Sequence, residues 1–159
     1  MHVRAATLDD AAAIARIYNQ GIEDRTATFE TRLRKEDDIR GWFDGRHPVL
    51  VVEDKGAVVA FAAAFTYRPR ECYAGIAEAS IYVDRACRGQ GAGRMALNGL
   101  IAAATAAGFW KLVSRIFTDN MASRRLVVSL EFREVGIYER HGQLDGVWRD
   151  VVIVERLLT

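Results

Sequence analysis

Three glycines lie within five residues in the segment Arg88–Arg94, whose sequence is Arg-Gly-Gln-Gly-Ala-Gly-Arg. The segment follows an expected strand, Ala79–Val83, and leads into an expected long helix. Glycines let the backbone approach a ligand closely, and the amides at a helix start lie at the positive end of the helix dipole. Such a loop typically binds an anion, usually a phosphate. The alternative is a tight turn whose glycines serve only the backbone conformation.

Two common phosphate-binding loops do not fit this segment. A P-loop ends in Gly-Lys-Ser/Thr, whereas the corresponding residues here are Gly93-Arg94-Met95. A dinucleotide-binding loop places a third glycine where this chain has Arg94, and it needs an acidic residue about twenty positions later, a region that contains none. The first class is excluded and the second is disfavoured.

The cysteines and histidines do not form a metal-binding pattern. Cys72 and Cys87 are far apart, and His2, His47 and His141 are scattered along the chain. A cysteine without a nearby base is most often a small buried hydrophobic residue, so we expect both cysteines to be structural. No metal site is predicted.

The composition indicates one folded domain over residues 1–159. Half of the residues are hydrophobic, 27% are charged, and the net charge is +1 at pH 7. A nearly neutral chain is not typical of a nucleic-acid-binding protein, which needs a basic face. The sequence contains no run of about 18 apolar residues, so it predicts no membrane span. The N-terminus carries no apolar leader, so we expect a cytoplasmic protein that does not contact membranes.

The hydrophobic pattern predicts an α+β fold with a mixed, mostly antiparallel sheet flanked by helices. A Thr7–Asp10 capping signal opens the first helix, and Gly108 ends the third. The expected strands are His2–Ala6, Val49–Glu53, Ala57–Tyr67, Ala77–Val83, Lys111–Phe117, Phe132–Tyr138 and Val147–Leu157, and the expected helices span about 9–24, 34–43, 92–107 and 120–130.

With Arg88, Gly91 and Gly93, the glycine loop resembles Arg/Gln-x-x-Gly-x-Gly/Ala, the pyrophosphate loop of the GNAT N-acetyltransferases. Other segments match the phosphinothricin-type branch in order and spacing, and together they cover nearly the whole chain. These segments are Ile17-Tyr18-Asn19-Gln20 with Thr28-Phe29, Arg70-x-x-Tyr73, Glu78-x-x-x-Tyr82-Val83, Asn120-x-x-Ser123 and Asp145–Asp150.

The resemblance implies the GNAT fold and an acetyl-CoA-dependent transfer of acetyl to the α-amine of a small amino-acid antimetabolite, of the phosphinothricin, methionine sulfoximine or arsinothricin type. It implies a strand that separates from its neighbour and binds the pantetheine arm, with an amide near Val83 facing the thioester oxygen. For Asn120, a helix cap is an equal alternative. The implied acetyl-CoA-binding residues are Ile81, Tyr82, Val83, Arg88, Gly89, Gln90, Gly91, Ala92, Gly93, Arg94, Asn120 and Ser123.

The resemblance also implies the residues that act on the acceptor. Glu78 matches the general base, and its apolar neighbours favour partial desolvation and a raised pKa; the alternative is a surface-facing strand acid. Arg70 and Tyr73 match acceptor-binding positions, and Arg suits a carboxylate because it offers two parallel donors. Thr28 and Phe29 would form the opposite wall. Ordinary structural roles remain open for three of them: Arg70 as a solvated loop cation, Tyr73 as a core residue and Phe29 as a hydrophobic plug.

Two positions depart from the family pattern. Val127 stands where many members have a Tyr or His that protonates the departing thiolate, so the thiolate would take its proton from water or from another Tyr. Glu131 stands where the family has Gly. If residue 131 keeps a left-handed conformation, Glu destabilises it by about 1 kcal/mol relative to Gly.

Other functions remain open from the sequence. The acceptor could be an aminoglycoside, a polyamine or a protein N-terminus, which are cationic, or the chain could be a non-catalytic acyl-CoA-binding regulatory module. The Arg70 loop favours an anionic acceptor. The apolar terminal strands, Phe132–Tyr138 and Val147–Leu157, need cover and favour a homodimer, as in the resembling enzymes.

Overall fold

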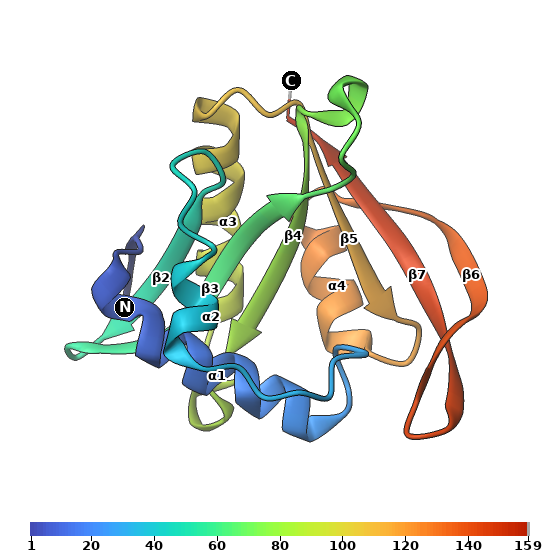
Figure 1. Cartoon of the computed structure of the whole chain (residues 1–159), viewed down its shortest axis with the longest axis horizontal. Helices are drawn as coiled ribbons and strands as arrows, with labels where there is room; N and C mark the ends of the chain where they lie inside the picture. The colour runs from blue at the N-terminus through green and yellow to red at the C-terminus, as the bar shows by residue number, and fades with distance from the viewer. Residues whose placement is uncertain (159) are drawn as a thin grey trace.

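The computed structural model describes residues 1–158 as a seven-stranded sheet in the order β1-β2-β3-β4-β5-β7-β6. Strands β4 and β5 run parallel, and the other neighbouring pairs run antiparallel. The predicted fold is therefore confirmed (Figure 1). The strands are β1 (His2–Ala5), β2 (Val49–Asp54), β3 (Ala57–Thr66), β4 (Ile76–Val83), β5 (Lys111–Phe117), β6 (Arg133–Leu144) and β7 (Val147–Leu157), and the helices are α1 (Ala11–Asp24), α2 (Glu36–Arg40), α3 (Ala92–Ala106) and α4 (Met121–Ser129).

Helices cover both faces of the sheet (Figure 1). Strand β3 shows how one sequence serves both faces, because successive side chains of a strand point in opposite directions. Its residues Ala60 and Ala62 pack in the core formed with α3 and α4. The alternate residues Phe61 and Ala63 pack in the core formed with α1 and α2. Small residues on the α3 side let that long helix lie close to the strands.

The helix boundaries differ from the expected ones near α1 and α2. A 3-10 turn, Leu8–Asp10, precedes α1, and the buried Asp10 carboxylate accepts a hydrogen bond from the Thr7 amide at 2.8 Å, which confirms the capping signal. Helix α2 covers half of its predicted span. It ends at Arg40 with Gly41 as its C-cap, and Trp42 and Phe43 then pack against the sheet from the segment after the helix.

Strand β6 is longer than the sequence indicated. It continues from the predicted end at Tyr138 to Leu144 through an irregular pairing with β7 between Tyr138 and Gly142. Arg140 adopts a positive φ of 46° in this irregular stretch. A bulge interrupts the alternation that identifies a strand in sequence, which is why the extension was missed.

The central strands β4 and β5 pair over a short distance and then diverge (Figure 1). Their pairing extends from Ile76–Lys111 to Glu78–Val113. At the point of divergence, the buried Ser114 hydroxyl donates to the Ala79 carbonyl at 2.9 Å. The divergence leaves the β4 segment beyond Ala79 free on its β5 side to bind an extended ligand.

Among the residues that the structure describes, no helix is long and apolar enough to cross a membrane. Neither cysteine forms a disulfide in this part of the chain. Cys87 is half-buried against the α3 core, as a structural role requires. Cys72 is exposed, so the expectation that it is a buried residue was wrong.

Candidate active site

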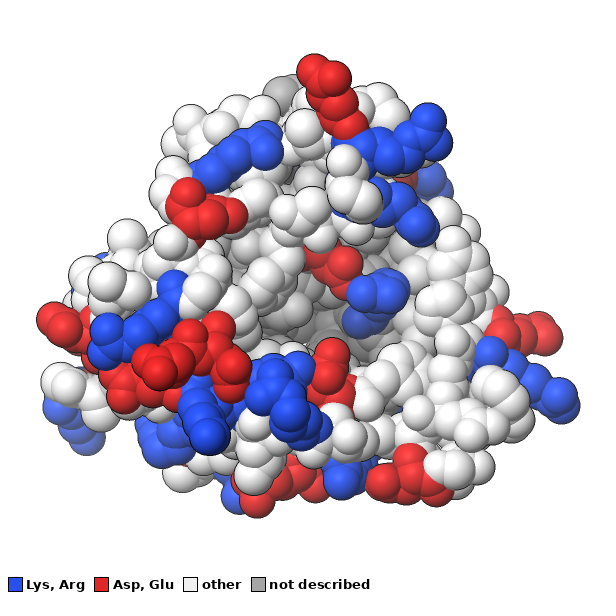
Figure 2. Space-filling view, in the orientation of Figure 1, with Lys and Arg blue, Asp and Glu red and all other residues white. Residues whose placement is uncertain are grey.

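A cavity of about 960 Å³ opens where β4 and β5 diverge. It is a hollow on the face seen in Figure 2, with an acidic and a basic side chain next to each other inside it. The glycine loop lines one part, and β4, β5 and the connection between α1 and α2 line the rest. The candidate residues found here are Thr28, Phe29, Glu78, Ile81, Tyr82, Val83, Arg88, Gly89, Gly91, Gly93, Arg94, Asn120 and Ser123.

Two glycines of the loop adopt left-handed backbone conformations. Gly89 and Gly91 have φ values of 77° and 89°, and Gly91 is the N-cap of α3. A Cβ atom at either position would meet nothing within 4 Å, so the left-handed conformation alone requires glycine there. Gln90 is exposed and Ala92 is buried, and both lie outside the cavity lining.

An acidic residue of α1 orients the first arginine of the loop. Arg88 and Arg85 each donate from Nη2 to one oxygen of the Asp24 carboxylate, both at 2.7 Å. Partial burial opposes ionisation of Asp24, but the two arginines outweigh it and lower the pKa of this carboxyl below its usual value. Asp24 therefore stays ionised and fixes Arg88 at the rim of the cavity.

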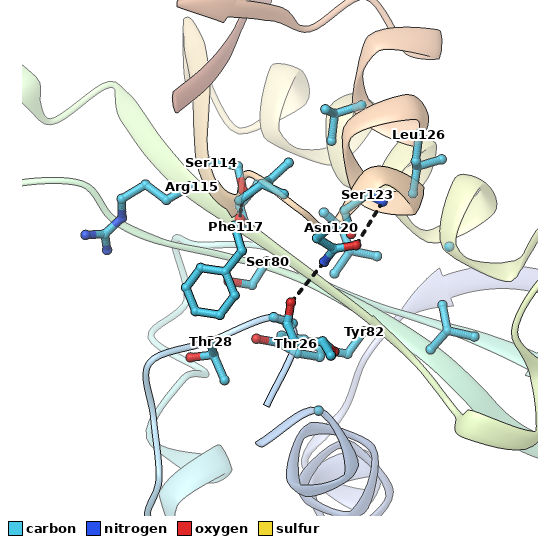
Figure 3. Close-up of a pocket in the computed structure, with 18 of the residues that line it drawn as sticks. Thr26, Thr28, Ser80, Tyr82, Ser114, Arg115, Phe117, Asn120, Ser123 and Leu126 are labelled. Carbon is cyan, nitrogen blue, oxygen red and sulfur yellow. Dashed lines mark hydrogen bonds between the residues drawn. The ribbon is translucent and has the colours of Figure 1, made fainter. Parts of the chain in front are cut away.

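Asn120 is the N-cap of α4, which confirms the helix-cap role, one of the two roles predicted for it. Its Oδ1 accepts a hydrogen bond from the Ser123 amide at 3.3 Å, and its Nδ2 donates to the Thr26 carbonyl at 3.4 Å (Figure 3). The cap satisfies one of the free amides at the helix start. The second bond joins the start of α4 to the chain segment that follows α1, between two residues that line the cavity.

Glu78 occupies the last position of β4 that pairs with β5, and it forms an ion pair with Arg115 of β5. Its Oε1 accepts hydrogen bonds from Arg115 Nε at 2.9 Å and from Nη2 at 2.7 Å. The Glu78 side chain is 23% exposed and that of Arg115 is 53% exposed. The carboxylate is therefore partly desolvated, in the cavity and next to a cation.

Aromatic residues build the wall opposite β4. Phe29 contacts the edge of Phe117, with ring centroids 4.8 Å apart, and the Arg149 guanidinium lies 4.2 Å from the centroid of Phe117. A Cβ atom at Gly142 would lie 2.9 Å from the Phe29 ring, so glycine lets β6 approach this ring closely. These contacts hold the connection after α1 against β5 and β6.

Tyr82 contributes a partly buried phenol to the cavity. Its ring stacks on Tyr18 with centroids 5.1 Å apart, and it also stacks on Phe61. Burial raises the pKa of Tyr82 well above its usual value. The hydroxyl is therefore protonated over the whole neutral pH range.

Arg70 and Tyr73 are not brought to this cavity within one chain. They line a separate hollow of about 140 Å³, together with Arg46, His47 and Arg68. The Tyr73 ring packs edge-on against Tyr67 at a centroid distance of 5.8 Å. The structure thus unites Thr28 and Phe29 with Glu78 and leaves the other two acceptor candidates elsewhere.

Sequence reasoning missed Arg115, Phe117, Ser80 and His141, which all line the cavity. Arg115 carried one signal, since it is a charged residue on the same face of a predicted strand as the apolar Val113 and Phe117. Its contact with Glu78 depends on the register of a parallel pair that joins distant segments. His141 lies in the irregular part of β6, beyond the predicted end of that strand.

The structure shows the surroundings of the two positions that depart from the family pattern. Val127 is 2% exposed and packs in the core on the α3 side, so it supplies no proton. Glu131 has a φ of 69°, which is the left-handed conformation, and its carboxylate lies 3.3 Å from Arg156 Nη2. The helix end is thus kept although glycine is replaced.

Residues 14–132 match the acetyltransferase (GNAT) family. This match covers most of the chain, so the protein belongs to that family, and it is an acetyltransferase. Within the family, it is similar along its whole length to enzymes of the phosphinothricin and methionine sulfoximine type. The L-methionine sulfoximine/L-methionine sulfone acetyltransferase of Salmonella typhimurium is 33% identical over 159 residues, covering 98% of this chain and 93% of that protein.

Solved structures agree with this assignment. A GNAT superfamily phosphinothricin acetyltransferase from Sinorhizobium meliloti, in complex with acetyl-CoA, matches with a TM-score of 0.90 at 29% identity, covering 98% of this chain and 86% of that one. A ribosomal-protein-alanine N-acetyltransferase from Brucella melitensis matches with a TM-score of 0.94 at 33% identity, covering 99% of both chains. The resemblance drawn from sequence motifs is confirmed.

Proposed function

We propose that the protein transfers acetyl from acetyl-CoA to the α-amine of a small amino-acid-like compound, of the phosphinothricin or methionine sulfoximine type, with Glu78 as general base. The observation that carries the proposal is that Glu78 and the glycine loop line one cavity, at the two ends of the β4 segment that diverges from β5. An anion-binding loop and a carboxylate base are the two groups that this transfer requires. The names of the relatives support the substrate class.

The loop Arg88–Arg94 would bind the diphosphate of acetyl-CoA, and the open backbone of β4 would pair with its pantetheine arm. A strand rises by about 3.3 Å per residue, so the Ile81 amide lies about 10 Å and the Val83 amide about 16 Å along β4 from Glu78. The thioester oxygen therefore fits better near Ile81 than near Val83, where the sequence had suggested it. A preorganised amide there would stabilise the charge that develops on this oxygen.

The acceptor amine is protonated in neutral water and must lose a proton before it can attack. Glu78 would take this proton, directly or through one water. The nitrogen then forms a bond to the thioester carbonyl carbon, and the C–S bond breaks. The nitrogen gives its second proton to water as the amide forms, the departing thiolate takes up one proton, and Glu78 returns the first proton to solvent, so that one proton is released per turnover. With Val127 buried at the usual acid position, water would supply the proton that the thiolate takes up.

A thiol-release assay with acetyl-CoA tests this function. The acceptor panel contains phosphinothricin, methionine sulfoximine, methionine sulfone, common amino acids, a polyamine, an aminoglycoside and a peptide with N-terminal alanine. We expect release with at least one of the small amino acids. Release with the polyamine or aminoglycoside alone would reject the substrate class, and CoA binding without any turnover would indicate a regulatory module.

The peptide stands in the panel because one specific observation favours it. The solved structure from Brucella melitensis that matches over 99% of both chains is called a ribosomal-protein-alanine N-acetyltransferase. A protein N-terminus presents an α-amine followed by a peptide bond, with no adjacent carboxylate. Turnover of the peptide in preference to every free amino acid would replace our proposal by this second function.

We further propose that a second copy of the chain covers the end of the sheet where β6 is the edge strand and β7 is its neighbour. Large apolar side chains that are about half exposed gather there, on an edge that would otherwise be free to pair. They are Val135, Ile137, Tyr138, Val147 and Trp148. Sedimentation analysis should show a dimer that Ile137→Glu converts to a monomer, and a monomeric wild type would reject this assembly.

A further inference from the structure

We propose that Arg115 binds the carboxylate of the acceptor while Glu78 receives its ammonium group, so that a zwitterionic α-amino acid takes the place of the ion pair seen in the cavity. This inference rests on the proposed function. It assigns the determinant of acceptor specificity to Arg115 of β5 and not to Arg70. An amine without an adjacent carboxylate would then be a poor acceptor.

The register of the two strands places both charges on one side of the sheet. Glu78 pairs with Val113, and Arg115 lies two residues further along β5. Side chains two residues apart in a strand share a face, so Arg115 projects from the same face as Val113 and reaches across to Glu78. Figure 3 shows its guanidinium extending away from Asn120 and Ser123, which lie where the coenzyme is expected.

The ion pair leaves polar atoms available to a ligand. Arg115 donates from Nε and Nη2 to the same carboxylate oxygen, Oε1 of Glu78. The side chain of Arg115 is 53% exposed, so a ligand can approach it from the open cavity. An ion pair with this much exposure contributes little to stability, and exchanging its partners for those of a ligand costs little.

An α-amino acid matches this arrangement because its two charges are separated by a single carbon. Its carboxylate can accept two parallel hydrogen bonds from the guanidinium. Its ammonium can donate to the Glu78 carboxylate that the guanidinium has released. No charge is left buried without a partner, which would be the main penalty of binding. The same exchange delivers the amine to the base that must deprotonate it.

Other arginines near the cavity are less suited to this role. Arg34 pairs with Glu30 at 2.8 Å, and its side chain is only 15% exposed. Arg88 pairs with Asp24 at the glycine loop. Arg70 lies in the separate hollow. Arg115 is thus the cation that directly contacts the proposed base.

Matched acceptors test this inference. The assay compares kcat/KM for L-methionine sulfoximine and for its α-carboxamide, which keeps the amine and removes the negative charge. We expect wild type to prefer the carboxylate. In Arg115→Met, kcat/KM for the carboxylate should fall roughly 10- to 100-fold, mainly through KM, while the carboxamide changes little. Arg115→Lys should restore part of the preference, because it keeps the charge but not the paired donors.

The variants separate this inference from the proposed function. Arg40→Met removes another half-exposed arginine, which pairs with Glu36 on α2 outside the cavity. This control variant should leave kcat/KM unchanged for both acceptors. Unfolding temperature and calorimetric binding of CoA verify that Arg115→Met is folded. If wild type is active and Arg115→Met keeps its preference for the carboxylate, or if Arg70→Met loses the preference instead, Arg115 is not the determinant. Absence of wild-type turnover with the whole panel rejects the proposed function and this inference with it.

Discussion

The two ends of the cavity are built in different ways. The end proposed to bind the coenzyme consists of consecutive residues, Arg88–Arg94, and it would bind through backbone amides whose direction depends on glycine conformations. The end proposed to bind the acceptor combines Glu78 of β4, Arg115 of β5 and Phe29 of the connection after α1, and it would bind through side chains. Single side-chain substitutions at the acceptor end can therefore change its specificity while the backbone conformation of the coenzyme end stays the same.

The largest effect should come from the acceptor end. Glu78→Gln keeps the shape of the side chain and removes the base, so kcat should fall by about 100-fold or more at neutral pH. The affinity for acetyl-CoA should not change, because the coenzyme end is intact. Steady-state kinetics and calorimetry measure the two quantities separately. Unchanged turnover would remove Glu78 from the reaction, and a parallel loss of coenzyme binding would show that the two ends are not independent.

The reciprocal change acts on the coenzyme end. Gly91→Ala places a Cβ on a residue with φ of 89°, which destabilises that conformation by about 1–2 kcal/mol. If the strain is relieved by turning the loop, the Kd for acetyl-CoA should rise about 5- to 30-fold. KM for the acceptor should stay constant when acetyl-CoA is saturating.

Gly45→Ala is the matched control for this prediction. Gly45 has a φ of 78° and no atom within 4 Å of an added Cβ, but it lies in the connection between α2 and β2, outside the cavity. It should lower stability like Gly91→Ala and leave the Kd for acetyl-CoA unchanged. Equal loss of affinity in both variants would mean that the effect reflects general destabilisation.

A smaller effect is expected at the wall of the acceptor end. Phe29→Ala removes the edge contact with Phe117, an aromatic interaction worth about 0.5–1.5 kcal/mol. The connection after α1 should then be less well held, and KM for the acceptor should rise about 2- to 10-fold. Phe29→Leu keeps an apolar contact and should behave more like wild type. A change in acetyl-CoA affinity instead of KM would assign this wall to the coenzyme.

The same division explains what the sequence could predict. The glycine loop, the strand before it and the helix after it are local features, and all three lie where the residues indicated. The contact between Glu78 and Arg115 depends on three paired positions in a parallel register between distant segments. No local signal reports such a register. Arg70 and Tyr73 were assigned through the family pattern. A sequence motif likewise does not show which cavity of the folded chain its loop lines.

Local departures from the pattern were predictable for the same reason. The sequence indicated that Glu131 would be strained if the end of α4 kept its left-handed residue, and the structure shows that it does. By contrast, the sequence did not indicate the extension of β6 that contains His141, because it passes through an irregular pairing with β7. Conformations that depend on residues within one turn can be predicted from the sequence, and those that depend on pairing with a neighbouring strand cannot.

The smallest effect on the reaction, and the only stabilising change, is expected outside both ends of the cavity. At the end of α4, the Phe132 amide donates to the Val127 carbonyl and the Glu131 amide donates to the Val128 carbonyl, both at 3.0 Å. This is the Schellman arrangement, in which the left-handed position favours glycine.

Glu131→Gly removes the strain and an exposed ion pair with Arg156 that contributes little. We expect a gain of about 1 kcal/mol, which is a rise of about 2–4 °C in Tm, with kcat and both binding constants unchanged. Glu131→Ala keeps the strain and loses the ion pair, so it should not stabilise; equal stabilisation by both variants would show that the carboxylate, and not the backbone, is unfavourable at this helix end.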